Sequence, residues 1–174
     1  MDIDELLFGT VSKYFKKRNK KKILLDNNAV FLKDVKPRLT ILARAITGNP
    51  IEIFPAEREG GYKNNNFFLP IYFNELSTKE QNLGLYFFRI LFLSVQSDLN
   101  INLIADEVFF DLKKQQILDL LFQKYPNSKE IYEELKTHFE LNATPKNPAD
   151  YSWIYGKLMQ NDKEENTETI LENF

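Results

Sequence analysis

The 174-residue sequence contains no cysteine and a single histidine, His138. The lack of cysteine excludes disulfide bonds, thiolate nucleophiles and thiolate metal ligands. One histidine cannot form the paired motif H-E-x-x-H, and the serine-hydrolase pattern G-x-S-x-G is missing as well. The most recognisable catalytic classes are thereby removed, and we predict no catalytic residue, no metal site and no cofactor.

Long hydrophobic runs are also missing. The most apolar stretch, residues 83–95, contains Arg89 and falls short of the roughly 20 residues that a transmembrane helix requires. The opening residues MDIDELLFG carry acids where a secretory signal peptide carries cations. We therefore expect a cytoplasmic protein with no membrane span.

The composition is that of an ordinary globular domain. Hydrophobic residues make up 43% of the chain and charged residues 28%, and the length suits one compact unit. We predict a single helical domain with a β-hairpin over residues 1–160, followed by an acidic flexible tail over 161–174. The net charge of -2 conceals a basic segment, because residues 13–22 carry seven cations.

Apolar residues recur at helical spacing along most of the chain. The expected helices begin near residues 5, 29, 77, 103, 128 and 151. Ser77–Glu80 reads as a capping box for the third helix, and Gly48 is placed as the C-terminal cap of the second. Residues 83–95 are apolar on nearly every face, which predicts a buried central helix in which Arg89 needs a partner or a route to the surface.

Two short segments have the alternation or aromatic content of strands. They are Ile51–Phe54 and Asn66–Leu69, with Gly60, Gly61 and three asparagines near and between them. This pattern predicts one β-hairpin with a long loop, in which the glycines supply positive φ angles. The predicted fold is mainly α (α+β): a helical bundle around one buried apolar helix, with a single β-hairpin.

The glycine pair is not a phosphate-binding loop. Such a loop needs lysine and a hydroxyl residue directly after its last glycine, whereas Tyr62 and then Lys63 follow Gly61. The acids Glu57 and Glu59 leave open a small enzyme with a carboxylate site at the hairpin loop.

The distribution of charged residues leaves two further functions to consider. The basic segment leaves open a helical nucleic-acid-binding domain, although the chain as a whole is mildly acidic. Asp106, Glu107 and Asp111 would share one helix and offer oxygen ligands to a hard cation, but a solvated helix face is the ordinary interpretation of such a cluster.

One region carries a family resemblance. Residues 37–96 combine a helix that ends at Gly48, a short strand, the Gly60-Gly61 loop, a strand that ends in Leu69-Pro70, and a helix that opens with Asn82 before an apolar-aromatic run. This order of features resembles the N-terminal region of the nitric-oxide-reductase activation protein family, NorD. The resemblance covers about a third of the chain and contains no catalytic signature.

The resemblance implies a chaperone-like accessory protein. Members of that family act with a MoxR-type AAA+ ATPase to activate or mature a metalloenzyme, and continue into a von Willebrand factor A domain with a D-x-S-x-S metal motif. That motif is absent from this sequence. The expectation is therefore a non-enzymatic interaction module that corresponds to the N-terminal domain alone, either as a separate protein or as one half of a split system.

The partner would be a protein, either the AAA+ ATPase or a separate von Willebrand factor A protein, and nucleic acid is the less favoured partner. A binding module needs an exposed apolar or charged patch and no reactive group. We expect two contact surfaces, the basic segment and the hairpin loop. The residues concerned are Lys16, Lys17, Lys20 and Lys21 in the first and Glu57, Arg58, Glu59 and Tyr62 in the second.

Overall fold

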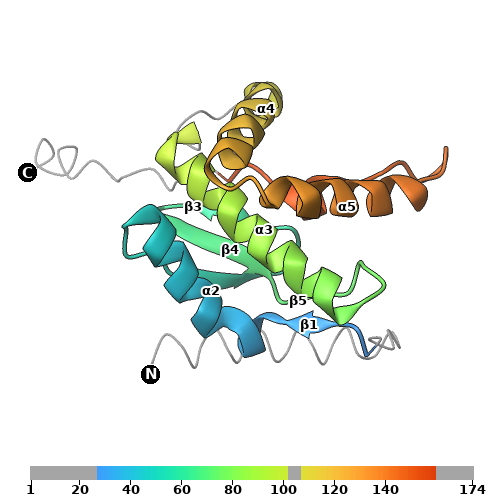
Figure 1. The fold of residues 1–174 in the computed structure, drawn as a ribbon, viewed down its shortest axis with the longest axis horizontal. Coiled ribbons are helices and arrows are strands. Elements are labelled where there is room, and N and C mark those ends of the chain that lie inside the picture. The colour runs from blue at the N-terminus through green and yellow to red at the C-terminus, as the bar shows by residue number, and fades with distance from the viewer. Residues whose placement is uncertain (1–26, 102–106, 160–174) are drawn as a thin grey trace, which may run out of the picture.

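The computed structural model of the chain describes residues 27–101 and 107–159, which form a mixed α+β fold (Figure 1). The helices are α2 (Leu32–Thr47), α3 (Lys79–Asp98), α4 (Glu107–Lys124), α5 (Ser128–Leu141) and α6 (Ser152–Tyr155). The strands are β1 (Val30–Phe31), β2 (Ile53–Ala56), β3 (Gly61–Lys63), β4 (Asn66–Pro70) and β5 (Tyr72–Phe73). The helix expected from residue 5, the basic segment and the acidic tail lie outside the described residues.

Helix α3 is the central element, as its all-round apolar sequence predicts. Together with α2 it crosses one face of the three-stranded sheet, and α4 and α5 lie on its other side (Figure 1). Its side chains at Leu85, Phe88, Ile90, Phe92 and Leu93 are all fully buried. None of the helices in the described part of the chain is both long enough and apolar enough to span a membrane.

The capping box at the start of α3 lies one residue later than predicted. Thr78 is the N-cap, with extended backbone angles, and its side chain accepts a hydrogen bond from the backbone N–H of Gln81 at 3.2 Å. The Gln81 side chain in turn accepts from the Thr78 N–H at 3.2 Å. The box is therefore Thr78–Gln81 and not Ser77–Glu80, because Thr78 is the residue held in the extended conformation that a cap requires.

Helix α2 ends as predicted. Gly48 has a φ of 68° and its N–H donates to the carbonyl of Arg44 at 2.9 Å, which closes the last turn. Its start is later than predicted, because Val30 pairs with Phe73 and so belongs to the antiparallel ladder of β1 and β5. The helix continues through Pro37 without interruption.

The strands form two small sheets, so the prediction of a single hairpin is wrong in its pairing. β2 runs parallel to β4, and the hairpin joins β3 to β4 in the order β2-β4-β3. Its two-residue turn is Asn64-Asn65, with φ angles of 50° and 59°. Two consecutive left-handed residues make a type I′ turn, whose twist suits a tight hairpin. The hairpin therefore closes at the asparagines, and not over the whole span from β2 to β4.

The later helices follow their sequence signals with some differences. Helix α5 begins at Ser128, as expected, and Asn127 stands at the N-cap position without a side-chain capping hydrogen bond. The Ser128 hydroxyl donates to the Tyr125 carbonyl at 2.6 Å. Helix α6 is a single turn. On α4, the apolar residues Val108 and Leu112 are 69% and 72% exposed.

Asn82 joins the segments that precede α3. Its side-chain oxygen accepts from the Leu76 N–H at 3.0 Å, and its Nδ2 donates to the carbonyls of Leu76, Thr78 and Asn28, each at 3.0 Å. The side chain is fully buried. Because buried backbone groups need partners, this amide satisfies the turn that leads into α3 and fastens the start of the described chain to it.

We predict that Asn82→Ala lowers the free energy of unfolding by about 2–3 kcal/mol, because it leaves buried backbone groups without a partner. Asn127→Ala is the control, since Asn127 also precedes a helix but its side chain makes no capping hydrogen bond and is exposed. Urea denaturation of both variants measures the difference. An equal, small loss in both would show that the Asn82 bonds contribute little.

Candidate functional site

The glycine loop of residues 57–60 is a close-packed crossover between β2 and β3. Gly60 has a φ of 64°, and a Cβ at this position would lie 2.1 Å from the carbonyl oxygen of Phe68. A Cβ on Gly61 would lie 2.2 Å from the carbonyl oxygen of Lys157. Both glycines therefore serve the close approach of backbone to backbone. The expected positive φ is confirmed at Gly60 but is wrong for Gly61, whose backbone is not left-handed and which is small because of the close approach alone.

The loop is tied to the segment after α6. The N–H of Lys157 donates to the Gly60 carbonyl at 2.8 Å. The buried Glu59 carboxylate lies 3.6 Å from the Lys157 ammonium, 3.3 Å from the Arg58 guanidinium and 3.4 Å from the Ser152 hydroxyl. Backbone and side chain together thus hold the crossover loop against the C-terminal part of the described chain.

Arg89 lies under this junction. It is fully buried in the middle of α3, and among the described residues its hydrogen-bond acceptors are all backbone carbonyls. Nε donates to Ile154 at 3.0 Å and Nη2 to Ser152 at 3.2 Å. The remaining bonds run to the carbonyls of Glu59 and Trp153. The partner that the sequence required is therefore a ring of carbonyls from α6 and the glycine loop.

Electrostatics keep this cation charged. Burial lowers the pKa of Arg89 to about 9, while the negative charge of Glu59 acts in the opposite direction. The guanidinium also faces the Phe73 ring, with 5.8 Å between its central carbon and the ring centroid. At neutral pH the group remains a cation, and it contacts the carbonyl end of α6, where a positive charge is favoured.

The structure separates the predicted loop residues into two pairs. Glu57 and Arg58 are exposed, and the Arg58 side chain retains 73% of its accessible surface. Glu59 and Tyr62 are buried, and the Tyr62 hydroxyl donates to the Asn65 side chain at 2.7 Å. The other predicted contacts, Lys16, Lys17, Lys20 and Lys21, lie outside the described residues.

The exposed pair belongs to a face whose other two members sequence reasoning did not identify. We call it the loop face, defined by Glu57, Arg58, Glu75 and Trp153. Glu57, Glu75 and Trp153 line a small hollow of about 20 Å³, and Glu75 and Trp153 also line an adjoining open hollow of about 300 Å³. Trp153 is partly buried and packs edge-on against Phe73. The only signal in the sequence was that this tryptophan is the single one.

His138 lies in the larger hollow. Its Nε2 is 2.9 Å from the Glu75 carbonyl oxygen and 3.1 Å from the side-chain nitrogen of Asn142. A ring N–H that donates to the carbonyl accounts for the shorter distance, so the imidazole holds the α5 end against the Glu75 turn. In the described part of the chain no cluster of histidine, aspartate and glutamate is arranged to hold a metal ion. Asp106 and the side chain of Glu107 fall outside that part.

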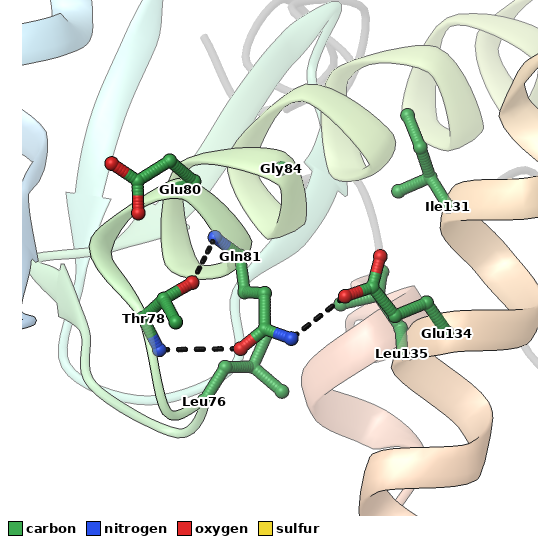
Figure 2. Close-up of a pocket in the computed structure, with 8 residues that line it drawn as sticks. All are labelled: Leu76, Thr78, Glu80, Gln81, Gly84, Ile131, Glu134 and Leu135. Carbon is green, nitrogen blue, oxygen red and sulfur yellow. Dashed lines mark hydrogen bonds between the residues drawn. The ribbon is translucent and has the colours of Figure 1, made fainter.

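A third hollow, of about 400 Å³, lies between the start of α3 and α5 (Figure 2). We call it the α3–α5 groove. Its lining consists of Leu76, Thr78, Glu80, Gln81, Gly84, Ile131, Glu134 and Leu135. The Gln81 amide donates across it to the Glu134 carboxylate at 2.7 Å, which links the two walls. A cavity of this size falls within the range of sites that bind ligands or side chains of a partner.

Comparison of the chain with protein-family models, with curated proteins and with solved structures found no match.

We predict that Arg89→Met destabilises the protein by about 3–5 kcal/mol, because it leaves four backbone carbonyls without their donor and removes a buried positive charge close to Glu59. In the double variant Glu59→Gln/Arg89→Met, part of that cost disappears, since the buried carboxylate that lost this nearby charge is also gone. Denaturant unfolding of the two single variants and the double variant yields the coupling energy, expected to exceed about 0.5 kcal/mol. Strictly additive losses would contradict coupling between the two residues.

We predict that Gly84→Ala raises the free energy of unfolding by about 1 kcal/mol, because glycine inside a helix is unfavourable and the new methyl group has room. The nearest atom to a Cβ at this position is Cγ2 of Ile131, at 4.0 Å. Gly60→Ala is the opposite case and should destabilise, since its Cβ would collide with Phe68. Thermal unfolding distinguishes the two, and destabilisation by Gly84→Ala would show that the groove does not accept even a methyl group.

Proposed function

We propose that this protein is a non-enzymatic interaction module that binds a protein partner through the loop face. The observation that carries the proposal is Trp153: a partly buried tryptophan whose backbone carbonyl is held by the buried Arg89, with exposed charged residues beside it. Tryptophan and arginine dominate the binding energy of protein interfaces, above all when they are rigidly positioned.

The buried charges of the region support binding over catalysis. Arg89 donates hydrogen bonds to four backbone carbonyls, and the Glu59 carboxylate contacts Arg58, Lys157 and Ser152. A carboxylate that acts as a general acid or base must reach the substrate proton within hydrogen-bond distance. Glu59 is 2% exposed, so a carboxylate enzyme at this loop would have to rely on Glu57 alone.

The resemblance of residues 37–96 to the NorD family supports a particular partner. We propose that the module acts with a MoxR-type AAA+ ATPase, or with a separate von Willebrand factor A protein, in the activation or maturation of a metalloenzyme. In this proposal the loop face and the basic segment make the contacts. The acidic and basic residues next to Trp153 would set the orientation and rate of docking, as complementary charges do at protein interfaces.

The experiment is an affinity capture of the tagged full chain from its own cells at moderate salt, followed by identification of the bound proteins. We expect a MoxR-type ATPase or a von Willebrand factor A protein, and about tenfold weaker binding of it by the charge-swapped variant Glu57→Lys/Arg58→Glu. The control is Lys129→Glu/Glu130→Lys, which makes the same swap at adjacent exposed residues of α5.

Capture of neither protein would contradict the proposed partner. Capture that is equally strong with both swapped variants would contradict the loop face as its binding site. Charge reversal of Lys16, Lys17, Lys20 and Lys21 tests the basic segment separately, and unchanged binding by that variant would exclude a contribution from these lysines.

A further inference from the structure

One residue that lines the α3–α5 groove, Gly84, has no side chain. Gly84 lies in the second turn of α3, where glycine is less favourable than alanine by about 1 kcal/mol. Neither a left-handed backbone nor a close contact requires it, since a Cβ would meet its nearest neighbour only at 4.0 Å. The backbone at Gly84 forms the floor of the groove on the α3 side (Figure 2).

Apolar side chains surround this floor. Leu76 and Leu135 are buried and Ile131 is partly buried, and all three line the groove. Figure 2 shows that Leu135 and Ile131 come from α5, whereas Gly84 lies on α3. An apolar recess between two helices is the geometry that receives one face of an amphipathic helix.

Among the described residues, the ionisable ones that line the groove are both acidic. They are Glu80 on α3 and Glu134 on α5, and both are exposed. A phosphate-bearing ligand, a nucleic acid or an anionic membrane would be repelled by two carboxylates at the rim. A segment that carries lysine or arginine beside its apolar anchor would instead be attracted to both walls.

We propose that the α3–α5 groove binds a cationic amphipathic helix of a protein partner. A large apolar side chain of that helix occupies the space above Gly84, and its flanking cations approach Glu80 and Glu134. The inference rests on the proposed function as an interaction module and adds a second contact surface, with the chemical class of the segment that it takes.

The probe is a synthetic 14-residue peptide of leucine and lysine, with all leucines on one helical face, and its binding to the full chain is measured by titration calorimetry. The variant Gly84→Leu fills the floor, and Glu80→Gln/Glu134→Gln neutralises the rim. We expect each to raise the Kd at least tenfold. The matched control Glu130→Gln/Glu133→Gln neutralises two exposed acids of α5 that do not line the groove, and should leave the Kd within twofold.

Several results would overturn the proposal. Equal binding of a scrambled peptide with the same composition would show attraction to charge alone, and an unchanged Kd for the rim variant would place the peptide elsewhere. Circular dichroism checks that Gly84→Leu is folded, and the rim variant tests the groove independently of it. If charge reversal at Lys16, Lys17, Lys20 and Lys21 tightened peptide binding, the occupant would be the basic segment of this chain and not a partner.

The groove proposal and the proposed function can fail separately. If the chain captures the ATPase through the loop face but does not bind the peptide, the proposed function stands and the groove proposal is wrong. If the chain binds the peptide in the groove but captures neither expected protein, the groove proposal stands and the proposed partner is wrong.

Discussion

Arg89 is a cation enclosed in the centre of the helix around which the domain is built. A buried guanidinium has five N–H donors and no water to receive them, so acceptors must come from the protein. The carbonyls of α3 around it are engaged within the helix, and the free ones at the end of α6 and in the glycine loop take their place. Segments about 30 and 65 residues away along the chain are thereby brought to the same point.

The glycines follow from the same constraint. If the carbonyls of residues 59 and 154 are to reach one guanidinium, the loop and the segment after α6 must nearly touch. Gly61 makes this approach possible, because a Cβ there would overlap the Lys157 carbonyl. Glu59 then supplies a negative charge close to the cation and draws in Lys157. The position of Trp153 is therefore set by the buried Arg89, which binds its carbonyl, and by Phe73, which packs against its ring. These interior contacts make the loop face rigid.

Sequence patterns predicted what depends on local chemistry. The apolar run of α3 and the cap at Gly48 are readable because periodicity and backbone preference act over a few residues. The parallel pairing of β2 with β4 was not readable, since it depends on where a two-residue asparagine turn closes a different hairpin. Arg89 visibly needed a partner, but backbone carbonyls leave no mark in the sequence. The position of Trp153 on the loop face and the α3–α5 groove were missed because both form only when elements that are distant in the sequence pack together.

The loop face and the groove are neighbours through one short segment. Glu75 lines the hollows beside Trp153, and the next residue, Leu76, lines the groove. Asn82 holds both backbone polar groups of Leu76, and the Glu75 carbonyl is bound by His138 from α5. These hydrogen bonds hold residues 75 and 76 against both α3 and α5, and so fix the position of the loop face relative to the groove. A partner that occupied both surfaces would therefore find them at a fixed spacing, and its affinity would rise through linked binding of two sites without any change in the fold.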